Sequence, residues 1–157
     1  MKIYIKSRKE IEAICNSDTS FQNSAVISIS DYGCDFALLK YKPYFLLQLN
    51  FDDVDNDVLL DEAGGNPTLE QIKQIEEKYH MFSDELAKRI ATFYFSVSSD
   101  VDVLICQCEY GQSRSAAVAA AIMEYENKNG INIFADDKYY PNKVVFRKTL
   151  KALHERK

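Results

Sequence analysis

The chain has 157 residues, of which 46% are hydrophobic and 27% charged, and its formal net charge is −5. This composition is typical of one soluble globular domain, here 1–157, and it excludes a disordered or fibrous protein. The sequence contains no block of five basic residues, so we expect no general binding to nucleic acid or membranes. No apolar run approaches the ~20 residues of a membrane span. The N-terminus also lacks a secretory signal, so we expect a cytoplasmic protein.

The usage of cysteine and histidine indicates free thiols rather than a disulfide scaffold or a metal site. The sequence has four cysteines, which are too few for a disulfide-crosslinked scaffold in a domain of this size: Cys15, Cys34, Cys106 and Cys108. The sequence has two histidines and no Cys-x-x-Cys pair, which disfavours a zinc site. We therefore expect no metal and no cofactor.

The predicted elements alternate between strands and helices along the chain. Ser7, Thr68 and Ser83 are helix-capping residues, and Thr68 begins a Thr-x-x-Gln capping box. β-branched and apolar runs mark the strands, and an acidic segment ending in Gly-Gly-Asn-Pro predicts a loop. In chain order we predict a strand at 3–5, a helix at 7–15, strands at 24–30 and 44–51, the loop at 51–67, helices at 68–78 and 83–97, a strand at 101–107, and helices at 115–130 and 143–157.

This alternation predicts an α/β fold, with a mostly parallel central sheet flanked by helices. The strand–turn–helix at 101–129 is the most strongly patterned unit, so we place it at the centre of the sheet. Ligands of open α/β sheets bind at the carboxyl ends of the strands. The segment from Cys108 to Arg114 lies at that edge and is therefore the predicted binding site.

The residue types in this segment favour the binding of a phosphate group. Gly111 permits a tight turn whose backbone N–H groups face one anion, and the following helix adds its positive end. Arg114 carries a planar cation that can hold two phosphate oxygens. The same positive field favours a thiolate at Cys108, placed for attack on phosphorus. Ser115 can donate its hydroxyl to the sulfur and help the thiolate to leave.

The sequence CEYGQSRS, with the pattern Cys108-x-x-Gly111-x-x-Arg114-Ser115, resembles the Cys-x5-Arg phosphate loop of the cysteine-dependent protein tyrosine phosphatases. The short domain and the alanine-rich helix after the loop resemble the dual-specificity branch most. More loosely, AVISIS, FLLQLNFDD and Tyr140-Pro-Asn142 resemble its early strands, its general-acid loop and its C-terminal end. The resemblance implies a phosphatase-like fold and a substrate-binding loop made of Glu109, Tyr110, Gly111, Gln112, Ser113 and Arg114.

The resemblance also implies a two-step mechanism with a phosphocysteine intermediate and an aspartic acid as proton donor. Asp52, Asp53, Asp55 and Asp57 are the candidates for the acid. The family pattern after the strand favours Asp53, with Asp52 next, although a solvated acidic loop is the simple alternative. The expected substrates are a phosphorylated protein or a small phosphomonoester, and phosphate, sulfate or vanadate should bind in the loop.

The sequence departs from the family pattern at one position. Such loops usually begin with His-Cys, whereas Gln107 precedes Cys108 here. A slower enzyme, or a pseudo-phosphatase that binds phosphorylated partners without turnover, therefore stays open. A sulfurtransferase is disfavoured because its loop normally places fewer residues before the cation. Arsenate reduction is disfavoured because no cysteine follows Cys108.

Overall fold

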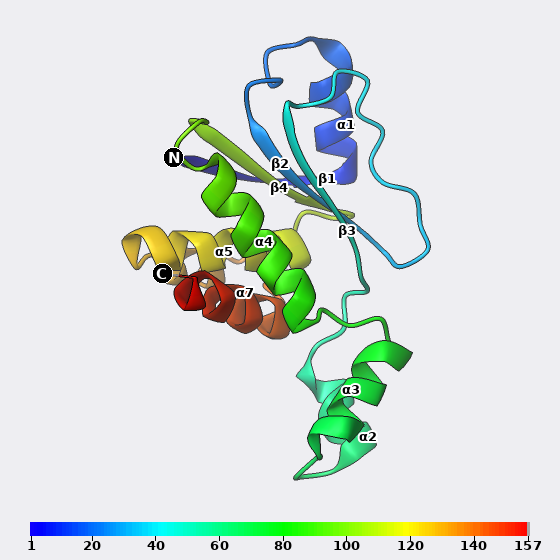
Figure 1. Cartoon of the computed structure of the whole chain (residues 1–157). Helices are drawn as coiled ribbons and strands as arrows, with labels where there is room; N and C mark the ends of the chain where they lie inside the picture. The colour runs from blue at the N-terminus through cyan, green and yellow to red at the C-terminus, as the bar shows by residue number, and fades with distance from the viewer. Residues whose placement is uncertain (157) are drawn as a thin grey trace.

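The computed structural model of the protein describes residues 1–156 and contains a four-stranded parallel sheet (Figure 1). The predicted α/β fold class is therefore confirmed. The strands are ordered β1-β4-β2-β3, so β4 is an interior strand, as its pattern predicted. Their bounds are β1 Lys2–Ser7, β2 Ala25–Ser30, β3 Phe45–Asn50 and β4 Val103–Cys108.

Seven helices complete the described part of the chain. Within residues 1–156, no helix is both long enough and apolar enough to cross a membrane. The predicted N-caps are confirmed, because Ser7, Thr68 and Ser83 each accept a hydrogen bond from a backbone N–H of the helix that follows. The helices are α1 Arg8–Ser17, α2 Asn56–Ala63, α3 Leu69–Lys78, α4 Asp84–Val97, α5 Arg114–Asn127, α6 Ile131–Phe134 and α7 Lys143–Glu155.

Helices cover both faces of the sheet. Successive residues of a strand point to opposite faces, so neighbouring residues pack against different helices. On one face, Val26 and Ile105 pack with Ile11 of α1. On the other, Ile27 and Leu104 belong to the large core that also contains buried residues of α4, α5 and α7. Figure 1 shows α2 and α3 projecting away from this layered body, between β3 and α4.

Two local predictions were wrong. Residues 56–63, expected in a loop, form α2, which is capped by Asp55 and places Val58 and Leu59 against a small cluster that includes Ile75 of α3. The helix predicted to end at Gly130 ends at Asn127, because Lys128 adopts a left-handed conformation with φ of 57°. The last residue of the predicted C-terminal helix, 157, lies outside the described residues.

The sheet brings its four carboxyl ends to one edge, because all of its strands are parallel. β4 ends at Cys108, β2 leads into Asp31, and β3 leads into the segment Phe51–Asp53. Residues that are far apart in the sequence therefore meet where the predicted site lies.

Candidate active site

The β4–α5 loop (residues 109–113) is held against the junction of β1 and α1. Gly111 has φ of +67°, and a Cβ atom placed there would lie 2.6 Å from the backbone nitrogen of Ser7. The backbone of Arg8 donates to the carbonyl of Glu109 at 3.1 Å. Both the left-handed conformation and the close approach of two backbones require glycine at position 111.

The thiol of Cys108 lies at the base of this loop. Cys108 is 2% exposed, and its Sγ is 3.0 Å from the Oγ of Ser115 in the first turn of α5. Among residues 1–156, no protein acceptor is hydrogen-bonded to the backbone N–H groups from Glu109 to Arg114. These amides, next to the N-terminal end of a 14-residue helix, are available to an anion.

Arg114 is the cation of the site and is only 4% exposed. Its Nη1 donates to the carbonyl of Phe51 at 2.7 Å and lies 2.6 Å from the Oδ1 of Asp31. Its Nε is buried and has no acceptor among the described residues. A buried donor on a charged group is costly to leave unpaired, so the fixed guanidinium presents an unused N–H where an anionic oxygen would satisfy it.

Asp53 contacts the same loop from the segment that follows β3. Its Oδ1 accepts from the Oγ of Ser113 at 2.8 Å and from the Nδ2 of Asn142 at 2.9 Å. Asn142 is itself fixed, because it is 3% exposed and its Oδ1 accepts from the backbone N–H of Val145 at the start of α7. The structure thus brings Asp53 to the loop that joins Cys108 to Arg114.

The other candidate aspartates make different contacts. The Oδ1 of Asp52 accepts from the backbone N–H of Tyr32, at 2.9 Å. Asp55 caps α2 and accepts from the backbone N–H of Lys143. Asp57 lies in the first turn of α2 and is exposed. Of the four candidates, Asp53 is the one whose side chain accepts a hydrogen bond from the β4–α5 loop in the described part of the chain.

The remaining loop residues divide into bound and exposed groups. Glu109 pairs with Arg8, whose Nη1 is 3.3 Å from its Oε2. Gln112 is exposed and accepts, through its backbone carbonyl, from the N–H of Tyr140 at 2.9 Å. Tyr110 is 78% exposed and free to border a ligand.

Gln107 occupies the position before the thiol and faces the interior. It is 1% exposed, and its Oε1 accepts from the Oγ of Ser28 on the neighbouring strand at 2.6 Å. The residue therefore joins two strands beneath the loop without adding a charge. The second thiol of the strand, Cys106, is 0% exposed, and burial raises its pKa, with a further contribution from Cys108. Cys106 is therefore kept in the unreactive thiol form.

Sequence reasoning missed Asp31 and Asn142. Asp31 is the first residue after β2, so its position at the carboxyl edge of a strand was the available signal. Asn142 was visible only as the residue before the last helix, and nothing in its neighbours indicates that it reaches Asp53. Both contacts join segments that are far apart in the chain.

Comparisons with known proteins find similarity in the fold but not in the sequence. No protein-family model and no curated protein matches the sequence. Several solved structures do match, among them these two crystal structures. Tk-PTP in the active form has a TM-score of 0.55 at 15% identity, over 100% of this chain and 94% of that one. PTPMT1 has a TM-score of 0.51 at 13% identity, over 98% and 90%. The chain therefore has the fold of these phosphatases, and the predicted resemblance is confirmed at that level.

Proposed function

We propose that the protein is a phosphomonoester hydrolase of the protein tyrosine or dual-specificity phosphatase type, acting through a phosphocysteine intermediate. The observation that carries this proposal is the buried guanidinium of Arg114, which has an unpaired Nε. The segment from Cys108 to Arg114 also contains a buried thiol and six backbone N–H groups, from Glu109 to Arg114, for which residues 1–156 supply no acceptor. A phosphate group supplies the oxygens that these donors lack.

In the first step, the thiolate of Cys108 attacks phosphorus while the bond from phosphorus to the leaving oxygen breaks. Asp53, in its acid form, donates a proton to that oxygen. Both protein contacts of this carboxyl use Oδ1, which leaves Oδ2 to carry the proton. Arg114 and the loop amides hold the phosphoryl oxygens throughout.

In the second step, water attacks the phosphocysteine and gives a proton to Asp53. The bond between sulfur and phosphorus breaks, and inorganic phosphate and the thiolate are released. Ser115 assists this step, because its Oγ lies 3.0 Å from the sulfur and can donate a hydrogen bond to the developing thiolate. The cycle regenerates the thiolate and the carboxylic acid.

The test is hydrolysis of an aryl phosphate by the native chain, with acid quenching in the first turnovers to trap the intermediate. We expect release of the phenol and a phosphoryl group attached to Cys108, located by mass spectrometry of the digested protein. Hydrolysis without phosphate on this cysteine would contradict the mechanism.

A binding protein with little or no turnover is the second candidate, favoured by the neutral contact between Gln107 and Ser28 beneath the loop. This candidate predicts that phosphate or vanadate raises the melting temperature of the native chain while aryl phosphate is not hydrolysed. Measurable turnover by native protein would exclude it.

Replacing Asp53 by asparagine should lower kcat on an alkyl phosphate by about 10²–10⁴-fold, because the leaving alkoxide then lacks its proton donor. The loss should be much smaller on nitrophenyl phosphate, whose leaving group is stable without a proton. Asp57→Asn, in the exposed first turn of α2, is the matched control and should retain native rates. An equal loss on both substrates would mean that Asp53 only organises the loop through Ser113 and Asn142.

A further inference from the structure

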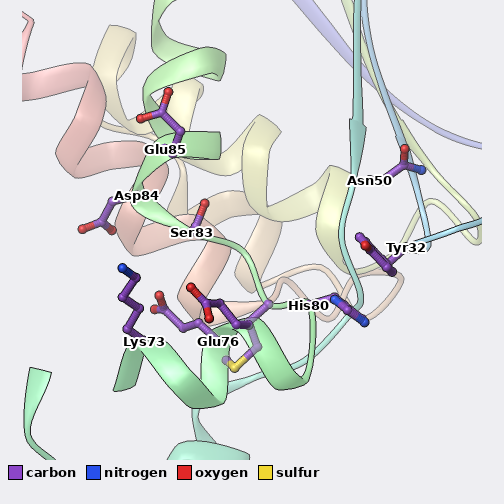
Figure 2. A pocket seen from close by; sticks show the side chains of 10 residues that line it. Tyr32, Asn50, Lys73, Glu76, His80, Ser83, Asp84 and Glu85 are labelled. Carbon is purple, nitrogen blue, oxygen red and sulfur yellow. The ribbon is translucent and has the colours of Figure 1, made fainter. Parts of the chain in front are cut away.

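A cleft lies between α3, the start of α4, the end of β3 and the segment that follows β2. Its volume is about 620 Å³. Figure 2 shows Tyr32, Asn50 and His80 at one end of the cleft, and Lys73, Asp84 and Glu85 at the other. The ring of His80 is stacked on that of Tyr32 with centroids 3.6 Å apart and an interplanar angle of 11°. The two stacked rings therefore form an aromatic wall at this end of the cleft.

The aromatic end of the cleft adjoins the candidate active site. Tyr32 directly follows Asp31, which contacts Arg114, and its backbone N–H donates to Asp52. The carbonyl of His80 accepts from the backbone N–H of Asp52 at 2.9 Å, one residue before Asp53. Adjacent residues lie about 3.8 Å apart along the chain. A substrate with its phosphate in the β4–α5 loop thus has the cleft beside it.

The lining of the cleft carries excess negative charge. Glu76 and Asp84 share Lys148, whose Nζ lies 2.5 Å and 3.3 Å from their carboxylate oxygens. Glu77 and Glu85 are exposed and join no ion pair in residues 1–156. Four carboxylates and one lysine, Lys73, line the cleft. The carboxylates outnumber the lysines even when Lys148 is counted, so the cleft favours a cationic group of the substrate and repels an anionic group beyond the phosphate.

We propose that the substrate is a phosphorylated polypeptide with lysine or arginine flanking the phosphorylated residue, and that this cleft binds the basic side chain. The inference rests on the proposed phosphatase function. A small phosphate ester would leave the cleft empty, and a phospholipid headgroup would place further negative charge against its carboxylates. A basic peptide complements both the positive loop and the negative cleft.

The test uses three phosphotyrosine peptides that are identical except for flanking lysines, glutamines or glutamates. For native protein, we expect kcat/KM to be on the order of tenfold higher for the lysine peptide than for the glutamate peptide at low salt. The preference should weaken with added salt, because the cleft carboxylates are exposed. Equal rates on all three peptides, or faster hydrolysis of phosphoinositide in vesicles than of the lysine peptide, would overturn the proposal.

The double variant Glu77→Gln and Glu85→Gln should reduce the preference to less than about threefold and leave aryl phosphate hydrolysis unchanged. The matched control, Asp100→Asn and Asp102→Asn, removes two exposed charges at the turn before β4, at the opposite edge of the sheet. An equal loss of preference in this control would assign the effect to the net charge of the protein and would overturn the proposal that the cleft binds the basic side chain. Failure of native protein to hydrolyse aryl phosphate would instead refute the proposed function itself.

Discussion

Replacing Cys108 by serine should abolish aryl phosphate hydrolysis, with a loss of at least about 10⁴-fold in kcat. A serine hydroxyl is almost entirely protonated at neutral pH, and the carboxylate of the β4–α5 loop, Glu109, is paired with Arg8. The substitution is nearly isosteric at a buried position 3.0 Å from Ser115, so we expect little change in the melting temperature. Steady-state kinetics and thermal unfolding measure the two effects.

The same variant should keep its affinity for inorganic phosphate, because the loop amides and Arg114 remain. Phosphate should therefore raise the melting temperature of this variant and of native protein to the same extent, by mass action on the folded state. Cys34→Ser, at the exposed cysteine, serves as the control for loss of a thiol and should be fully active. Native rates in Cys108→Ser would rule out the sulfur as the nucleophile.

The fold was predictable because each strand and most helices carry their own local pattern. AVISIS is buried at every position, as its unbroken apolar and small residues indicated, and a strand buried on both faces belongs inside a parallel sheet. The helix α2 was hidden by its acidic composition and by the Gly64-Gly65 turn that follows it. Its two partly buried apolar residues, Val58 and Leu59, stabilise the helix by packing beside α3, which the local sequence does not indicate.

The part of the candidate site that lies in one short segment was predictable from the sequence. The contacts between distant segments were not. Cys108, Gly111 and Arg114 lie within one turn, so their spacing alone implies a shared anion site. The contact from Asp31 to Arg114 spans 83 positions, from 31 to 114, and the contact from Asn142 to Asp53 spans 89. Strand order decides these contacts, and the sequence predicted a parallel sheet without its order. The pairing of β4 with β2, which places Asp31 beside the loop, therefore had to come from the structure.

Replacing Arg114 by lysine should lower kcat/KM by about 10²–10³-fold, although the positive charge is kept. A lysine places one ammonium group where the guanidinium spreads its donors over Nε and two terminal nitrogens. In the native site, Nη1 is already used by Asp31 and Phe51, whereas Nε and Nη2 have no acceptor within residues 1–156 and are left for phosphate oxygens. A lysine ammonium drawn to Asp31 would turn away from the phosphate.

This variant should differ from Cys108→Ser in its ligand binding. Because the lost donors contact the phosphate itself, inorganic phosphate should no longer raise the melting temperature of Arg114→Lys. Arg147→Lys, on the exposed side of α7, is the control and should behave as native protein in both assays. If Arg114→Lys kept native phosphate stabilisation, the buried guanidinium would be a structural tie between Asp31 and Phe51. The anion site would then consist of the loop amides alone.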